Sequence, residues 1–118
     1  MPLLFVYGTL KRGLRNHGLV QQTHSTFIGE ASLKDHAIYT FAVCPFAIEE
    51  PGETIHGELI QVNFDDMYRF DKLECGYSKK RVTVTMSNGK EIQAFIYYWA
   101  DVGIKFIGKK VKNGRYRG

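Results

Sequence analysis

The sequence predicts an α+β protein built mainly from a closed or nearly closed antiparallel β-sheet, and three observations point to this class. Short runs of apolar and β-branched residues recur along most of the chain. Asn88-Gly89 lies between two alternating runs, as in a β-hairpin. Only residues 63–74 carry a credible helical repeat. Because closure removes exposed edges, a closed sheet is the economical arrangement for many strands and little helix.

The first half of the chain is expected to be mostly β-structure. In order, we expect a buried strand at residues 3–7, strands at 25–33 and 36–43 divided by Lys34-Asp35, a turn-rich loop at 44–53, and further β-structure at 54–62. The clearest hairpin comes later. Residues 82–87 alternate between apolar and polar side chains, Asn88-Gly89 is the favoured pair for a two-residue type I′ turn, and residues 91–100 return as the partner strand.

The helix expected at residues 63–74 has signals at both ends. Asn63 has the side chain of an N-cap, and Asp65 and Asp66 fall in the first turn, where the helix dipole favours negative charge. Gly76 is the expected stop. Apolar residues recur every three positions and predict the buried face: Phe64, Met67, Phe70 and Leu73.

Length and charge favour one domain with a basic end. The 118 residues, of which 44% are hydrophobic, can bury one core, so we expect a single domain over residues 1–118. Residues 104–118 form a basic C-terminal tail with no acids and six of the sixteen cations, which leaves ten cations against twelve acids in residues 1–103. Nucleic-acid binding would rest on that tail alone, without an accompanying motif, so we do not expect it.

Several other classes of protein are not expected. No apolar run is long enough to span a bilayer, and the first residues lack the features of a signal peptide, so we expect a cytoplasmic protein. Cys44 and Cys75 have no CxxC spacing and the histidines have no ligand spacing, so we expect no metal site. Two free thiols are favoured, and a bridge between them is the alternative.

Glu74 is the candidate catalytic residue that helix geometry alone suggests. It lies four positions after Phe70 and seven after Met67, which places it on the inward face at the carboxyl end of the helix. Burial and the helix dipole would both raise the pKa of its carboxyl, as suits a general base near neutral pH. The alternative is that the last turn frays and Glu74 points to water, and helix geometry by itself favours that alternative.

The stretch "YGTLKRG", residues 7–13, also allows two interpretations. Gly8 permits a positive φ, so the backbone N–H groups of Gly8, Thr9 and Leu10 could converge on a carboxylate or phosphate. The alternative is an ordinary exposed turn, because the stretch does not fit a Walker loop. In either case Lys11-Arg12 is expected to lie on the surface, where it could steer an acidic substrate.

Taken together, these motifs resemble a known family. "FVYGTLKRGLRNHGLV", "HGELIQVNFDDMYRFDKLECGY" and the final "YRG" are similar, in order and spacing, to the gamma-glutamyl cyclotransferase-like superfamily. The opening block is most similar to gamma-glutamylamine cyclotransferases. The resemblance implies a small mixed, mainly antiparallel β-barrel with short helices at its mouth.

The resemblance also implies a site and a reaction. The substrate-binding loop of the family falls on Tyr7, Gly8, Thr9 and Leu10, its acid/base glutamate falls on Glu74, and Tyr77 would be a wall or a hydrogen-bond donor. Without a cofactor, the α-amine of a γ-glutamyl amide would attack its own γ-carbonyl, releasing 5-oxoproline and an amine. The alternative is a binding module that holds a small anionic metabolite in the same pocket without turning it over.

Overall fold

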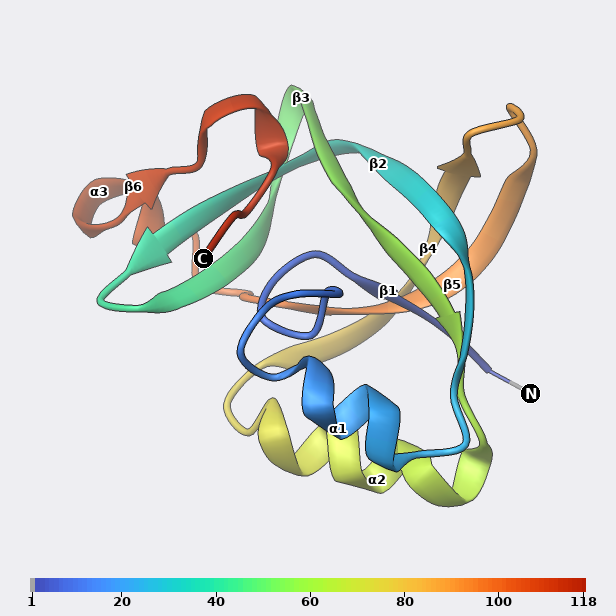
Figure 1. The fold of residues 1–118 in the computed structure, drawn as a ribbon. Coiled ribbons are helices and arrows are strands. Elements are labelled where there is room, and N and C mark those ends of the chain that lie inside the picture. Colours follow the sequence, from blue (N-terminus) through green and yellow to red (C-terminus); the bar gives the residue numbers. More distant parts are fainter. Residues whose placement is uncertain (1) are drawn as a thin grey trace.

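The computed structural model describes residues 2–118 and contains a closed barrel of five strands with short helices at one end (Figure 1). The barrel strands are β1 (Leu3–Val6), β2 (Thr26–Phe41), β3 (Cys44–Gln61), β4 (Ser78–Met86) and β5 (Glu91–Tyr98). They follow the order β3-β1-β5-β4-β2, and pairing of β2 with β3 closes the ring. The β1–β5 pair is parallel and the others are antiparallel, which confirms the predicted mixed barrel.

The longest pair of strands corrects the predicted division of residues 25–62. β2 is one strand and not two, because Asp35 takes a left-handed conformation (φ +59°) that accommodates a bulge without ending the pairing. Its carboxylate accepts a hydrogen bond from the backbone N–H of Gly52 at 3.0 Å. The predicted loop at 44–53 was also wrong, because this stretch belongs to β3 and completely buries Ala47 and Ile48.

The β4–β5 hairpin is confirmed, but its predicted type I′ turn is wrong. Gly89 has φ +86°, whereas Asn88 does not have the positive φ that type I′ requires. The N–H of Gly89 donates to the carbonyl of Met86, and the N–H of Met86 donates to the carbonyl of Lys90. The connection is therefore a three-residue loop with glycine at its left-handed position.

Helix α2 (Phe64–Leu73) begins as predicted, with the Asn63 side chain accepting the N–H of Asp65 at 2.8 Å. Met67 and Phe70 are buried as expected, but Phe64 is 71% exposed and Leu73 is 41% exposed. At about 100° per residue, positions nine residues apart lie on opposite sides of a helix. Phe64 and Leu73 therefore could not share the buried face.

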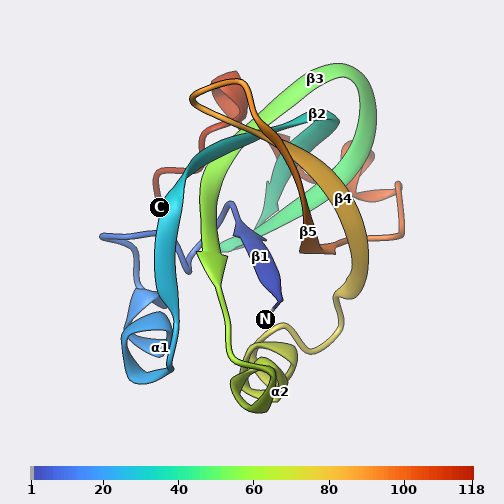
Figure 2. The same ribbon diagram turned by 90° about the vertical axis from the view of Figure 1, so that its right-hand side faces the viewer.

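Helices α1 (His17–Gln22) and α2 lie together below the barrel in both ribbon views (Figures 1 and 2). The guanidinium of Arg69 donates to the carbonyl of Gln22 at 3.4 Å, and His24 contacts Asp66 at 3.1 Å. These contacts join the segment that follows β1 to the helix that follows β3. No helix among residues 2–118 is long and apolar enough to cross a membrane.

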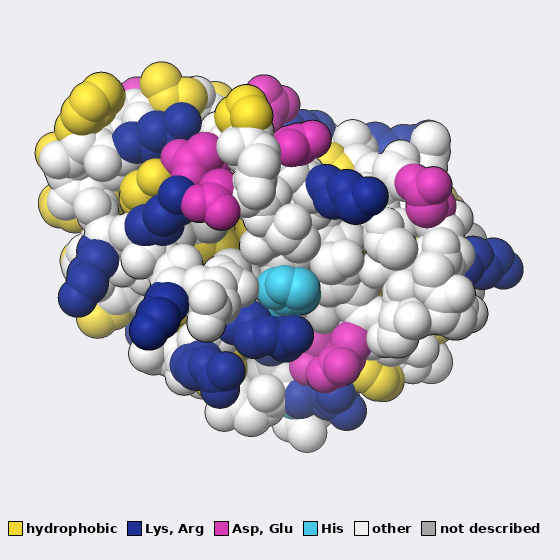
Figure 3. All heavy atoms as spheres, turned by 90° about the horizontal axis from the view of Figure 1, so that it is seen from above, with side chains coloured by type: hydrophobic (Ala, Val, Ile, Leu, Met, Phe, Trp, Pro, Cys, Tyr) yellow, Lys and Arg dark blue, Asp and Glu magenta, His cyan; other side chains and the backbone are white. Residues whose placement is uncertain are grey.

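Residues 104–118 lie against the barrel and contain three short elements: α3 (Ile104–Ile107), β6 (Lys109–Lys110) and the 3-10 helix η1 (Lys112–Gly114). β6 pairs with β2, and Ile104 and Tyr116 are buried. Lys110 forms ion pairs with Glu50 and Glu53. Figure 3 shows basic side chains spread over one face of the molecule with acidic ones among them, so that this face is not uniformly positive.

Candidate functional site

One pocket contains all the residues that the sequence analysis named for the site. Together with the open solvent at its mouth, it holds about 350 Å³ of space free of atoms. The turn after β1 forms one wall, and the end of α2 forms another. Its lining residues are Phe5, Val6, Tyr7, Gly8, Thr9, Leu10, Pro45, Glu74, Tyr77 and Tyr97.

The turn at residues 7–10 owes its glycine to close packing. Gly8 does not adopt the positive φ that glycine permits. A Cβ at this position would instead lie 2.7 Å from Cγ of Pro45, so only glycine lets the turn approach β3 this closely. The sequence could not indicate this contact, because Pro45 reaches Gly8 only through the long pairing of β2 with β3.

The backbone N–H groups of this turn are free. Within residues 2–118, none of the N–H groups of Gly8, Thr9 and Leu10 donates a hydrogen bond to the protein. Because unpaired N–H groups in a partly enclosed site need an acceptor, the turn can bind a carboxylate or a similar anion.

The segment that follows holds this turn in place. The amide of Asn16 donates to the Thr9 hydroxyl at 2.8 Å, and its backbone N–H donates to the Thr9 carbonyl at 2.9 Å. Nδ1 of His17 lies 2.9 Å from the carbonyl of Leu10. The turn is therefore fixed before any ligand arrives.

Lys11 and Arg12 also fasten the turn; Arg12 lies on the surface as expected, with 52% of its side chain exposed, whereas Lys11 is only partly exposed. The Lys11 ammonium is half-buried and donates to the carbonyl of Tyr116 at 2.7 Å, and burial lowers the pKa of this lysine. Arg12 binds Glu58 through its backbone N–H at 2.9 Å and through Nε at 3.2 Å. The turn is thereby tied both to the C-terminal segment and to β3.

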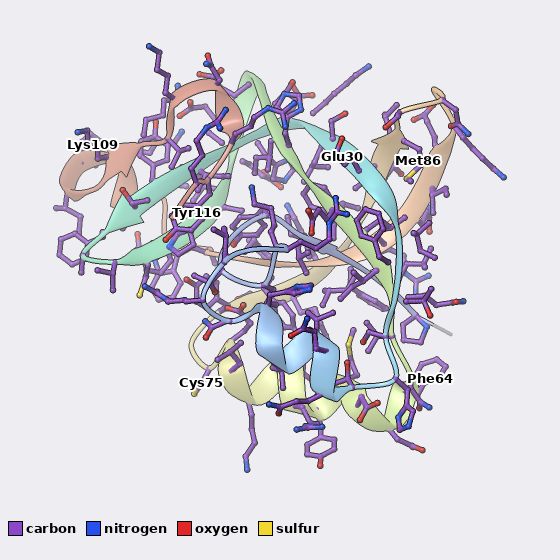
Figure 4. All side chains as sticks on the ribbon, in the orientation of Figure 1. Glu30, Phe64, Cys75, Met86, Lys109 and Tyr116 are labelled. Atoms are coloured by element: carbon purple, nitrogen blue, oxygen red, sulfur yellow. The ribbon has the colours of Figure 1, made fainter. Side chains whose placement is uncertain are left out.

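Glu74 lies at the C-cap of α2 and faces the same pocket. Its backbone N–H donates to the Phe70 carbonyl at 2.9 Å, and Gly76 ends the helix with φ +96° as predicted. Burial raises the pKa of the Glu74 carboxyl from 4.5 to about 7. Cys75, by contrast, is exposed and points away from the barrel in Figure 4. The last turn therefore keeps Glu74 inward, which was the less favoured alternative from helix geometry alone.

Three tyrosines surround Glu74. Their hydroxyls all donate elsewhere: Tyr7 to the carbonyl of Tyr97 at 2.7 Å, Tyr77 to the carbonyl of Pro45 at 2.7 Å, and Tyr97 to Oδ1 of Asp71 at 2.6 Å. Burial is the main cause that raises the pKa of each phenol, and the charge of Glu74 contributes to all three, after Tyr77 at Tyr7 and after Asp71 at Tyr97. All three tyrosines therefore stay neutral donors.

Sequence reasoning named Tyr7 and Tyr77 for the site but not Tyr97, Pro45 or Asp71. The alternation of residues in β5 could have indicated an inward face for Tyr97, whereas its hydrogen bond to Asp71 depends on how α2 packs against that strand.

The chemistry available at this pocket is that of a carboxyl group and unpaired N–H donors. Among residues 2–118, no group of three or more His, Cys, Asp and Glu side chains could hold a metal ion. Cys44 and Cys75 are both free thiols, as favoured from their spacing.

The barrel is shared with solved structures. It superimposes on an uncharacterised protein from Pyrococcus horikoshii with a TM-score of 0.75 and 25% identity, covering 98% of this chain and 89% of the other. It also superimposes on an AIG2-like protein from Mus musculus with a TM-score of 0.75 and 26% identity, covering 91% and 84% respectively. The fold is thus that of an AIG2-like β-barrel.

Sequence comparison identifies the family. The model of the family "Gamma-glutamyl cyclotransferase, AIG2-like" matches residues 4–117, and the chain belongs to this family. A Methanocaldococcus jannaschii protein named "Putative gamma-glutamylcyclotransferase" is 31% identical over 121 residues, which cover 99% of this chain and 97% of that protein. A gamma-glutamylaminecyclotransferase of Danio rerio is 34% identical over 80% of this chain and 66% of its own length. The resemblance found in the sequence motifs is confirmed.

Proposed function

We propose that this protein is a γ-glutamyl cyclotransferase that releases 5-oxoproline and a free amine from a γ-glutamyl amide, with Glu74 as general acid and base. The observation that supports this most directly is the position of Glu74 across one small pocket from the free N–H groups of residues 8–10. A carboxyl whose pKa is about 7 can both accept and return a proton near neutral pH.

The reaction needs little beyond folding the substrate and moving protons. The turn at residues 7–10 binds the α-carboxylate of the glutamyl group, and its N–H groups polarise the γ-carbonyl. Glu74 takes a proton from the α-ammonium group, and the freed amine forms a bond to the γ-carbon. The amide C–N bond then breaks as Glu74 returns the proton to the departing nitrogen, and the extra proton on the ring nitrogen passes through Glu74 to the released amine, which leaves as an ammonium ion. Because nucleophile and electrophile belong to one molecule, correct positioning supplies much of the rate enhancement.

Tyr77 contributes a wall of this site in our proposal. Its ring stacks on Phe46 at 5.3 Å and meets Trp99 edge-on at 5.5 Å, while its hydroxyl is bound to Pro45. The Danio rerio relative's name supports a γ-glutamylamine as the substrate of this chain. A cytoplasmic location, expected from the sequence, is part of the same proposal.

The test is to incubate the pure protein with γ-glutamyl-lysine isopeptide and with γ-glutamyl-alanine and to measure 5-oxoproline. We expect product from at least one of them, and Glu74→Gln should lower kcat by about 100-fold or more, as loss of a general base does. Cys75→Ser is the matched control, because this exposed neighbour does not line the pocket. Absence of product from both compounds, or full activity in Glu74→Gln, would overturn the proposal.

The free N–H groups of the turn also favour a second candidate, a binding module for a small anionic metabolite. In that case a γ-glutamyl compound would raise the melting temperature and be recovered unchanged. Conversion to 5-oxoproline rules this candidate out.

A further inference from the structure

The hydroxyl of Tyr97 is held differently from those of the other two phenols beside Glu74. Tyr7 and Tyr77 donate to backbone carbonyls, whereas Tyr97 donates to the side chain of Asp71. A backbone acceptor is fixed by the fold, but a side-chain acceptor can be removed without changing the course of the chain. Asp71 is therefore the one partner in this set that substitution can test cleanly.

Asp71 is well placed to keep its acceptor role. It lies on α2 one turn before Glu74, and the ammonium of Lys79 contacts its two oxygens at 3.0 and 3.3 Å. Burial alone would raise the pKa of the Asp71 carboxyl, but the hydrogen bond from Tyr97 and the charge of Lys79 outweigh burial and hold this pKa below its usual range. Asp71 is therefore ionised at neutral pH and presents a strong acceptor to the phenol.

We infer that Asp71 is a positioning residue, which holds the hydroxyl of Tyr97 so that this phenol lines the pocket beside Glu74 without donating to its carboxyl. The inference rests on the proposed function and deepens it, because it names what sets the protonation behaviour of the proposed acid and base.

The physical reason lies in what a phenol would do if it were released. A hydrogen bond donated to a carboxylate favours its charged form and lowers its pKa. Since all three phenols donate elsewhere, burial dominates at Glu74 and keeps its pKa near 7. The other ionisable groups near this part of the pocket are Cys44 and Tyr116, which raise the pKa of Tyr77, and Arg15, which lowers it.

Release of the Tyr97 hydroxyl should therefore be visible at Glu74. The charge of Glu74 already contributes to the raised pKa of Tyr97, after burial and the bond to Asp71, so the two groups interact. A buried hydroxyl that loses its acceptor is costly and turns to another one. Glu74 is the carboxyl in the same pocket.

The experiment measures the pKa of the Glu74 side chain by carbon-13 NMR in the full chain, with Glu74→Gln to assign its signal. The variants are Asp71→Ala, Tyr97→Phe and the double variant. In Asp71→Ala the pKa of Glu74 should fall by about 1–2 units, because hydrogen bonds to charged groups are of that order. In Tyr97→Phe and in the double variant it should stay near 7.

The double variant separates the hydroxyl from the charge. Both Asp71→Ala and the double variant lose the negative charge of Asp71, so only the difference between them reports the hydroxyl of Tyr97. Asp71→Asn keeps an acceptor and should restore the behaviour of the parent protein. Asp65→Ala, at an exposed aspartate of the same helix, is the matched control.

Equal Glu74 pKa values in Asp71→Ala and the double variant would overturn the inference. Because the side chain of Asp71 is 46% exposed, we expect Asp71→Ala to fold. Asp71→Ser is the second variant, to be used if Asp71→Ala does not fold. In the active protein, the acid limb of the pH profile of kcat/KM should move to lower pH in Asp71→Ala alone. The NMR titration needs no substrate, so it tests the role of Asp71 independently of the enzyme activity. If only the proposed function is wrong, no 5-oxoproline forms but the expected differences in the Glu74 pKa among the variants remain.

Discussion

Replacing Glu74 with glutamine should stabilise the protein at high pH and not at low pH. Glu74 is partly buried in an otherwise neutral pocket, and burial raises its pKa from 4.5 to about 7. Near pH 4 the carboxyl is protonated in the folded and the unfolded chain, so burial carries no charge penalty. Near pH 8 it is ionised in both, and the folded chain must hold the charge where water is scarce.

The direction and the size of the effect follow from these two pKa values. A carboxyl whose pKa is higher in the folded than in the unfolded chain makes the protein less stable as the pH rises from about 4.5 to about 7. At about 1.4 kcal/mol per pKa unit, this rise corresponds to about 3 kcal/mol of unfolding free energy. Glutamine is neutral throughout, so Glu74→Gln should gain about that amount, relative to the parent protein, between pH 4 and pH 8.

Urea denaturation of both proteins between pH 4 and pH 8 measures this difference directly. Taking the difference at each pH cancels the titration of every other group, and any constant cost of burying the glutamine amide shifts the curve without changing its shape. A difference that does not vary with pH, or that favours the parent protein as the pH rises, would refute the assignment of Glu74 as a carboxyl with a raised pKa.

The further predictions concern three glycines. Gly8→Ala should lower the unfolding free energy by about 1–3 kcal/mol, as overpacking does, and abolish ligand binding, because the added Cβ lies 2.7 Å from the Pro45 ring. Gly18→Ala, with nothing within 4 Å, should be neutral or stabilising in the same urea titration. Gly114→Ala should lower the unfolding free energy more than Gly8→Ala does, because the added Cβ would lie 1.9 Å from the Thr54 carbonyl oxygen and residue 114 has φ +65°. A small loss of unfolding free energy would mean that the C-terminal segment packs loosely.

Local signals predicted the parts of the site that depend on neighbouring residues. Asn63 caps α2 because the donor to its side-chain oxygen, the N–H of Asp65, is only two residues away. Helix geometry placed Glu74 on the side of Met67 and Phe70, but by itself it favoured a frayed last turn, so the inward position depended on the family motif. The family motifs at the turn and at Glu74 then indicated that the two belong to one pocket, and all the named residues do line it.

Long-range pairing decided what the sequence could not predict. Residues 44–53 contain proline, glycine and two adjacent glutamates, which are typical of a loop, but pairing of residues 44–49 with β2 overrides this local preference. The glycine at position 8 is required by Pro45, and not by its own φ. In each case the deciding contact joins residues far apart in the sequence, where local patterns carry no information.

The pairing of β1 sets the order in which the pocket can form. β1 is synthesised before its partners, because it pairs with Glu58–Gln61 of β3 and with Phe95 of β5, which both follow much later in the chain. Such distant pairings form slowly, because the chain loses the entropy of closing a long loop before it gains the contacts between the strands. An apolar strand without partners is also prone to pair with other chains. The turn after β1 thus acquires its opposite wall only when the barrel closes, so binding at this turn would report completed folding.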